Sequence, residues 1–333
     1  MIVRPEVAVQ SLLSSFVPIW ALTAVGYLVG RSGLLGPEAE SVLGRFVFHV
    51  AMPAALFNMI ARAPLGGFAN LSMLAFAAGT ALATVLGFVV SRRLFGRKLA
   101  ERAIGGMAAG YVNSANLGIP VAIQVLGDAS FLAQVLLFQV LLVSPVILTL
   151  LDAGTDAATA TAANTAAGTG RRWGAVGRML LMPVRNPIIM ASALGVLVSA
   201  VGWQLPAALG RSCELLGGAG VPTALLTLGM SLHGRRPAPG SEPAVEVGAL
   251  VALKTLVQPA FALLVGGPLL HLPAHQLLTV VLCSALPTAQ NAFVYARQYG
   301  LDTGIARNSV MYSTLVSMVT LTGIYWLLGP GHS

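Results

Sequence analysis

Ten runs of mainly apolar residues, most of them about 20 residues long, recur along this sequence. A helix of about 20 apolar residues spans the hydrocarbon core of a bilayer. Only 9% of the residues are charged, whereas about a quarter are charged in soluble domains. The sequence therefore predicts an all-α integral membrane protein, multi-pass in the plasma (inner) membrane, with the lipid bilayer around it. The ten predicted spans are residues 9–30, 41–61, 71–90, 104–126, 130–151, 187–201, 215–232, 247–270, 275–298 and 305–328.

The basic residues fall mainly on one side of this predicted topology. Fourteen Lys and Arg residues lie in the connections after the first, third, fifth, seventh and ninth spans, and three lie on the opposite side. Because cytoplasmic loops carry the excess of positive charge, this pattern predicts that both termini are extracytoplasmic. Loop position thus explains the formal net charge of +8, which indicates no nucleic-acid partner.

The fourth predicted span contains the polar stretch NSANLGIP at residues 113–120. Pro120 lacks a backbone N–H and crowds the preceding turn, so it kinks or breaks a helix, and Gly118 weakens the helix further. Broken helix is tolerated at membrane depth only where it is buried in protein or lines a cavity. The stretch predicts either a kinked helix whose polar groups bind a neighbouring helix, or part of a binding site in which a second half-helix begins near Gly118 to Val121.

A second interrupted span lies at the corresponding position of the other half. The stretch PTAQNAFVYA at residues 287–296 places a proline and two amides in the middle of the ninth predicted span. Each half has five spans, an odd number, so the halves must be inverted relative to each other. Paired interrupted helices in inverted repeats point to a secondary transporter with its site near the midplane. We therefore predict a first repeat at residues 1–151, a cytoplasmic linker at residues 152–186 and a second repeat at residues 187–333.

The two polar stretches resemble the two signatures of the auxin efflux carrier family. NSANLGIP is similar to the motif of the first repeat, and PTAQNAFVYA, followed by QYG at residues 298–300, is similar to that of the second. The resemblance covers essentially the whole chain. It implies two inverted five-helix repeats whose broken fourth and ninth helices cross, as in the sodium/proton-antiporter-like and bile-acid-transporter-like folds. Scaffold and transport domains are then each drawn from both repeats.

The same resemblance implies a small organic anion as the substrate. The family includes carriers of auxin-like monocarboxylates and of malate- or malonate-like dicarboxylates. It also leaves a homodimer open, as well as H⁺ or Na⁺ as a coupling ion.

A carboxylate bound at mid-membrane needs hydrogen-bond donors and positive potential. The N-terminal ends of the half-helices after each break would supply both, and nearby amides would add donors. We expect Asn116 and Asn291 to approach the substrate carboxylate, with Asn113, Ser114 and Gln290 as second candidates. The alternative for each amide is a hydrogen bond between helices alone.

Other residues are expected to shape the breaks or to line the cavity. Gly118, Pro120 and Pro287 would shape the two breaks, with any substrate contact made through the backbone. His49 is either a proton-linked group or a structural histidine, and Lys254 either snorkels to the surface or pairs with substrate or a gate. The predicted cavity or coupling candidates are His49, Pro53, Asn58, Pro222, Lys254 and Gln258.

No acidic residue lies in the middle of a predicted span. Sodium/proton antiporters of crossed-helix design need buried acids, so this absence weakens that interpretation and suits an anionic substrate. Cys213 and Cys283 have no metal or redox spacing, and no metal or other cofactor is expected. We also expect no enzyme activity, because the sequence lacks a His-Glu-x-x-His motif, a buried Asp pair and an evident Ser–Lys or Ser–His arrangement.

Two alternatives to a simple organic-anion carrier stay open. The first is a sodium- or proton-coupled symporter of bile-acid-transporter type, whose flux would depend on that ion. The second is a non-transporting membrane sensor, which would move none of a panel of organic acids across a liposome membrane.

Overall fold

A computed structural model describes residues 5–62, 70–118, 121–126, 130–164, 186–233 and 244–329. Within these ranges, the side chains of residues 5–15, 123–124 and 156–164 are not described. The described residues fold into helices and contain no β-strand. The all-helical class predicted from composition is therefore confirmed for this part of the chain.

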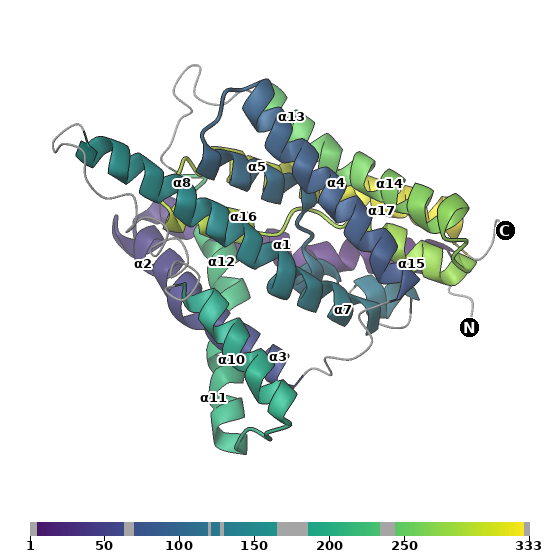
Figure 1. Cartoon of the computed structure of the whole chain (residues 1–333), viewed down its shortest axis with the longest axis horizontal. Coiled ribbons are helices and arrows are strands. Elements are labelled where there is room, and N and C mark those ends of the chain that lie inside the picture. The colour runs from purple at the N-terminus through teal and green to yellow at the C-terminus, as the bar shows by residue number, and fades with distance from the viewer. Residues whose placement is uncertain are drawn as a thin grey trace.

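Figure 1 shows the arrangement of the helices. The elements, with π-helical turns written η, are α1 (Pro5–Ser32), α2 (Ala39–Phe46), η1 (Val47–Ala51), α3 (Met52–Ala61), α4 (Leu71–Arg93), α5 (Leu99–Gly110), η2 (Ser114–Gly118), η3 (Ala122–Leu126), α7 (Ser130–Phe138), η4 (Gln139–Val143), α8 (Ser144–Asn164), α10 (Pro187–Val201), α11 (Ala207–Gly218), α12 (Gly220–Met230), α13 (Ala244–Ala252), η5 (Leu253–Val257), α14 (Gln258–Leu264), η6 (Val265–Leu269), α15 (Ala274–Ala285), α16 (Asn291–Gln298) and α17 (Gly304–Leu328).

Six continuous helical segments of the described chain are long and apolar enough to cross a bilayer. Each overlaps a predicted span, and so do three shorter apolar helices. The predicted fourth and ninth spans are both interrupted. The six long segments are Ala39–Ala61, Leu71–Arg93, Ser130–Thr155, Ala207–Met230, Ala244–Leu269 and Gly304–Leu328.

Proline positions explain several of the π-helical turns. Pro53, Pro145 and Pro259 each follow a π turn (η1, η4 and η5) by two residues. A proline inside a helix lacks a donor and its ring clashes with the carbonyl four residues earlier. The extra residue of a π turn widens the helix at that carbonyl, so these segments continue across their proline instead of ending there.

The helix α8 extends into the stretch predicted as a linker. It continues to Asn164, so the start of the predicted linker, residues 152–186, is helical. The local sequence DAGTDAATATAAN is rich in alanine, the residue with the highest helix propensity. Residues 165–185 lie outside the described part of the chain.

The helices gather into two groups. In the first group, α3 packs against α10 and α11, and α12 packs against α1 and α2. In the second, α4 packs against α5 and α14, and α15 packs against α14 and α17. Figure 1 places α3, α10 and α11 below, and α4, α13, α14, α15 and α17 in the upper right. The helix α16 lies between the two groups.

Small residues allow close helix packing in the first group. A Cβ added at Gly26 of α1 would lie 2.8 Å from the Leu226 Cα of α12. A Cβ added at Gly195 of α10 would lie 2.9 Å from the Ile60 Cβ of α3. Because lipid supplies no hydrophobic drive between helices, such close approach is a main source of packing energy in a membrane.

Candidate functional site

Two interruptions of helix meet in the protein interior. The first break, residues 111–113, separates α5 from η2, and the second break, residues 286–290, separates α15 from α16. They pair as an isolated antiparallel β-bridge. The Asn113 N–H donates to the Pro287 carbonyl at 2.8 Å, and the Ala289 N–H donates to the Tyr111 carbonyl at 3.1 Å. Each break thereby supplies hydrogen-bond partners for backbone N–H and carbonyl groups of the other. Buried backbone groups need such partners.

The first break lies closer to the N-terminus than the sequence predicted. Helix resumes at Ser114, in η2, and not near Gly118. The extended backbone begins at Tyr111 (φ −86°, ψ 111°), because the second break is available there as a hydrogen-bonding partner. Pro120, which was expected to cause the break, lies outside the described residues.

A cavity of about 110 Å³ lies beside this crossing. Its walls come from both breaks, from the η1–α3 segment, from α11 and α12, and from α7 and η4. It therefore separates the crossing from the first group of helices. The lining residues are Val47, Met52, Ala55, Leu56, Tyr111, Val112, Asn113, Ser114, Ala115, Asn116, Leu136, Val140, Gly217, Gly220, Val221, Ala224, Ala289, Gln290 and Asn291.

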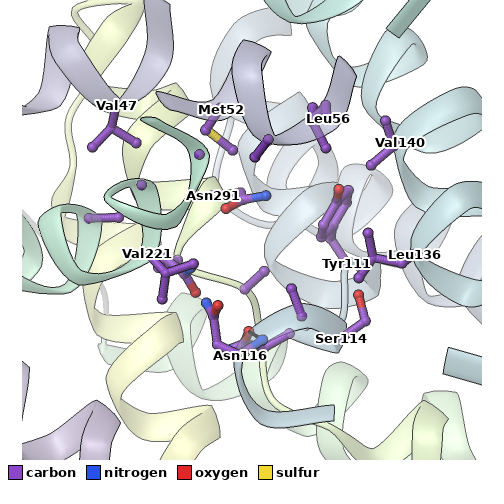
Figure 2. A pocket seen from close by; sticks show the side chains of 18 of the residues that line it. Val47, Met52, Leu56, Tyr111, Ser114, Asn116, Leu136, Val140, Val221 and Asn291 are labelled. Carbon is purple, nitrogen blue, oxygen red and sulfur yellow. Dashed lines mark hydrogen bonds between the residues drawn. The ribbon is translucent and has the colours of Figure 1, made fainter. Parts of the chain in front are cut away.

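Three polar residues, in the first break and in the turn η2 that follows it, lie on the cavity wall. The Asn113 amide oxygen accepts a hydrogen bond from the Asn116 N–H at 3.4 Å, as an N-terminal cap of η2 would. The Ser114 hydroxyl donates to the Gln139 amide oxygen at 2.6 Å. Figure 2 shows the Asn116 and Ser114 side chains at the cavity, with Asn116 turned toward its centre. Asn116 is partly exposed there, whereas Asn113 and Ser114 are buried.

Two amides of the second break face the same cavity. The Gln290 side chain is only 3% exposed, and its amide oxygen has no hydrogen-bond partner among the described residues. Asn291 opens the helix α16, and Figure 2 shows its amide extending into the cavity from the side opposite Asn116. The five polar side chains predicted as a substrate site thus lie together at one cavity.

Sequence reasoning missed two residues of this site. Tyr111 lines the cavity, and its hydroxyl is 3.0 Å from the Ser144 hydroxyl. Gln139 holds the first break, because its amide donates to the Val112 carbonyl at 3.0 Å while accepting from Ser114. A glutamine in the middle of a mainly apolar span was the signal available for Gln139.

Gly118 and Pro287 do not line the cavity. A Cβ at Gly118 would lie 2.9 Å from Leu286 Cδ1 and would also meet Leu132. Pro287 offers its carbonyl to the first break. Both residues therefore shape the crossing.

Four of the residues predicted as cavity or coupling candidates also do not line the cavity. His49 is exposed, with its ring nitrogens near the Arg45 carbonyl (3.1 Å) and the Gln298 amide (3.4 Å). Asn58 is partly buried on α3. Pro53 and Pro222 do not touch the cavity, although the residues preceding them, Met52 and Val221, do.

Lys254 and Gln258 contact the helix ends next to the two breaks and do not line the cavity. Both side chains are fully buried. The Lys254 ammonium donates to the Ser284 carbonyl at 2.9 Å, and the Gln258 amide donates to the Gly110 carbonyl at 3.3 Å. Lys254 therefore does not snorkel to the surface, because the end of α15 supplies an acceptor in the interior.

The other end of α16 is tied to the first group of helices. Arg297 forms an ion pair with Glu40 of α2. The Phe48 ring meets the Tyr295 and Tyr299 rings edge to face, with centroids 5.7 and 6.2 Å apart. We call these five residues the contact layer.

Tyr299 also links this layer to α8 and to the start of α10. Its hydroxyl donates to the Asp152 carboxylate at 2.6 Å and accepts from the Asn186 amide at 3.1 Å. Burial, together with that carboxylate, raises the pKa of Tyr299. The phenol therefore stays neutral and remains a donor at physiological pH.

The cavity lining carries no charged side chain. Of the residues that line it, none is Asp, Glu, Lys, Arg or His. Within the described part of the chain, no cluster of three His, Cys, Asp or Glu residues could hold a metal ion. The polar groups at the cavity are amides, hydroxyls and the first turns of η2 and α16.

The sequence matches a family of membrane transport proteins and is similar to several transporters over nearly its whole length. The sequence pattern of the family described as "Membrane transport protein" matches residues 11–325. The chain is 27% identical to the "Putative malonate transporter" of Rhizobium meliloti (strain 1021), over 94% of this chain and 95% of that protein. It is 26% identical to the "Uncharacterized transporter YfdV" of Escherichia coli (strain K12), over 92% and 95%. It is 23% identical to "Auxin efflux carrier component 8" of Arabidopsis thaliana, over 96% and 98%.

Proposed function

Because the chain belongs to the membrane transport protein family, the auxin efflux carrier family that its two motifs resemble, we propose that it is a carrier of small organic anions that works by alternating access. One observation carries this proposal, the cavity at the crossing. Amides from two breaks far apart in the sequence converge on it, and no acidic residue lines it. Such a lining offers hydrogen-bond donors to a carboxylate and does not repel it. It also places no positively charged side chain in contact with the carboxylate, which would hinder release.

The substrate class follows from the same chemistry. Asn116, Gln290 and Asn291 can donate N–H groups to carboxylate oxygens, while Val47, Met52 and Val221 offer apolar contacts. The relatives are named for malonate and auxin, a dicarboxylate and a monocarboxylate. We propose a small mono- or dicarboxylate for this chain.

We further propose that the chain crosses the membrane ten times, as two inverted five-helix repeats at residues 1–151 and 187–333 with both termini extracytoplasmic. Equivalent helix pairs support this proposal. The packing of α1 on α12 has a counterpart in α10 on α3, and α4 on α5 has one in α14 on α15. The close contacts at Gly26 and Gly195 occur in the first two of these pairs.

The two helix groups correspond to the fixed and the moving domain of the proposed carrier. We propose that the first group is the scaffold and that the second group, with the crossing and α16, is the transport domain. The contact layer then holds α16 against the scaffold on one side of the cavity. Transport requires the Glu40–Arg297 ion pair to separate as the transport domain moves.

The test is transport by purified protein in liposomes. Wild-type protein is expected to show saturable flux of radiolabelled malonate or indole-3-acetate, and Asn116→Ala and Asn291→Ala are each expected to lower it at least about tenfold, because a lost charge-assisted hydrogen bond costs about 1.5–3 kcal/mol. Asn58→Ala, which removes an amide outside the cavity, is the matched control and should retain the flux.

Two outcomes would count against this function. Normal flux in both cavity variants would contradict the site. A wild-type protein that moves no organic acid would favour a membrane sensor instead. Repeating the flux with an imposed Na⁺ or pH gradient separates the symporter alternative, since only a coupled carrier accelerates with that gradient.

A further inference from the structure

Lys254 is a buried lysine that does not line the cavity and forms no ion pair with a carboxylate among the described residues. It lies in η5, in the middle of the long segment Ala244–Leu269, and none of its surface is exposed. Its ammonium donates to the carbonyl of Ser284, one residue before the end of α15. The C-terminal end of a helix carries partial negative charge. Lys254 therefore caps α15 where the second break begins.

Gln258, one turn further along the same segment, does the equivalent task without a charge. It is also fully buried, and its amide donates to the carbonyl of Gly110, the last residue of α5. Its amide also donates to the Thr80 hydroxyl at 3.0 Å. One segment thus caps both broken helices, one with a cation and the other with a neutral amide.

A neutral donor would have been sufficient as a cap. Burying an ammonium costs far more than burying an amide unless a negative charge compensates it. Among the described residues, Lys254 forms no ion pair, and Glu246 on the same segment is already paired with Arg97 at 2.9 Å. The cavity beside the crossing is where the proposed substrate would bring a negative charge.

We propose that Lys254 is the positioning cation of the anion site. It holds the end of α15 at the crossing, and its charge attracts the substrate anion across the crossing without touching it. The bound anion is then the counter-charge that Lys254 lacks. This assignment rests on the proposed function and explains how a cavity lined by neutral groups selects anions.

The distinguishing readout is how an affinity loss depends on substrate charge. A Coulombic contribution scales with the charge of the ligand, whereas a misplaced helix end weakens all ligands alike. Binding is measured by calorimetry on purified full-length protein, with acetate as the monoanion and malonate as the dianion at pH 7.5. Lys254→Gln is expected to weaken acetate binding about tenfold and malonate binding about a hundredfold, because the Coulombic contribution doubles when the ligand carries two charges.

Two further variants separate charge from capping. Lys254→Arg keeps the charge, so both affinities should stay within about threefold of wild type. Gln258→Leu removes the neutral cap of α5, so it should weaken both anions by the same factor. If Lys254→Gln does not fold, the Arg variant decides, because it must keep the wild-type preference for the dianion.

The outcomes are distinct. Equal losses for acetate and malonate in Lys254→Gln, no loss at all, or a Lys254→Arg variant without dianion preference would each overturn the assignment and leave the carrier function standing. Wild-type protein that binds neither anion, nor any other carboxylate tried, would overturn both together.

Discussion

The first break is held by neutral amides, whereas the second is held by a lysine and a hydroxyl. Gln139 and Gln258 donate to carbonyls at the first break. Lys254 and Ser317 donate to carbonyls at the end of α15. The backbone problem is the same in both halves, because each broken helix leaves carbonyls that have no partner in the next turn. The same backbone arrangement is therefore stabilised by different side chains in the two halves, a glutamine at the end of α5 and a lysine at the end of α15.

The two breaks also differ in length and in their support. The first is three residues long and depends on Gln139, a residue of another helix, for two hydrogen bonds. The second is five residues long and includes Pro287, whose ring fixes part of the backbone. The comparison can be tested by placing matched changes in each break.

The largest effect is expected when a negative charge is placed in the cavity. Asn291→Asp and Asn116→Asp should each lower organic-anion flux by about a hundredfold or more, since like charges within about 4–6 Å in a low-dielectric site repel strongly. Asn58→Asp, outside the cavity, is the control. A loss confined to one of the two cavity variants in liposome flux would show that only one break meets the substrate.

The next effect concerns the support of the first break. Gln139→Leu should lower the free energy of unfolding by about 2–3 kcal/mol, because it leaves the Val112 carbonyl and the Ser114 hydroxyl buried without a partner. Unfolding in detergent, followed by circular dichroism, measures this cost. The partly exposed Gln134 is the matched control, and Gln134→Leu should cost less. Equal costs would show that Gln139 does not hold the break.

A smaller effect is expected where the two breaks meet. The Thr288 hydroxyl donates to the Ala108 carbonyl at 2.6 Å, so Thr288→Val should cost about 1–2 kcal/mol in the same unfolding assay. Thr288→Ser keeps the hydroxyl and should recover most of that loss. Failure of serine to recover stability would assign the effect to packing.

The smallest effect is expected at the second break. Ser317 donates to the Ala285 carbonyl through a longer bond of 3.2 Å, so Ser317→Ala should cost about 0.5–1 kcal/mol. Thr320→Val, which removes a hydroxyl bonded within its own helix, serves as the control. If Ser317→Ala lowered the free energy of unfolding as much as Gln139→Leu does, the two breaks would not differ in how strongly side chains support them.

Much of the helical framework could be predicted from apolar runs alone. The run predicted at residues 187–201 matches α10 in both bounds, and the run at 305–328 begins one residue after α17 does. Bilayer thickness fixes the length of such helices, so composition is enough to locate them. The five polar residues at the cavity could also be found, because amides at mid-span are conspicuous in a chain this apolar.

Interactions between distant segments could not be predicted. The first break begins at Tyr111 because residues 287–289 supply its backbone partners, and nothing near residue 111 indicates this. Lys254 had an acceptor 30 residues away, at Ser284, so its distance from the membrane surface was a poor guide. Tyr111 was missed because an aromatic residue in a membrane span is ordinarily packing.

The bridge between Val112 and Thr288 also constrains biogenesis. During synthesis, the ribosome must add about 175 more residues after the first break before its partner exists. Until then the Tyr111 carbonyl and the Asn113 N–H have no partner from the second half, so the first break cannot take its final form. Insertion of the early helices and completion of the crossing are therefore separate events. Between them, the first half lies in the bilayer without the backbone hydrogen bonds that the second break supplies.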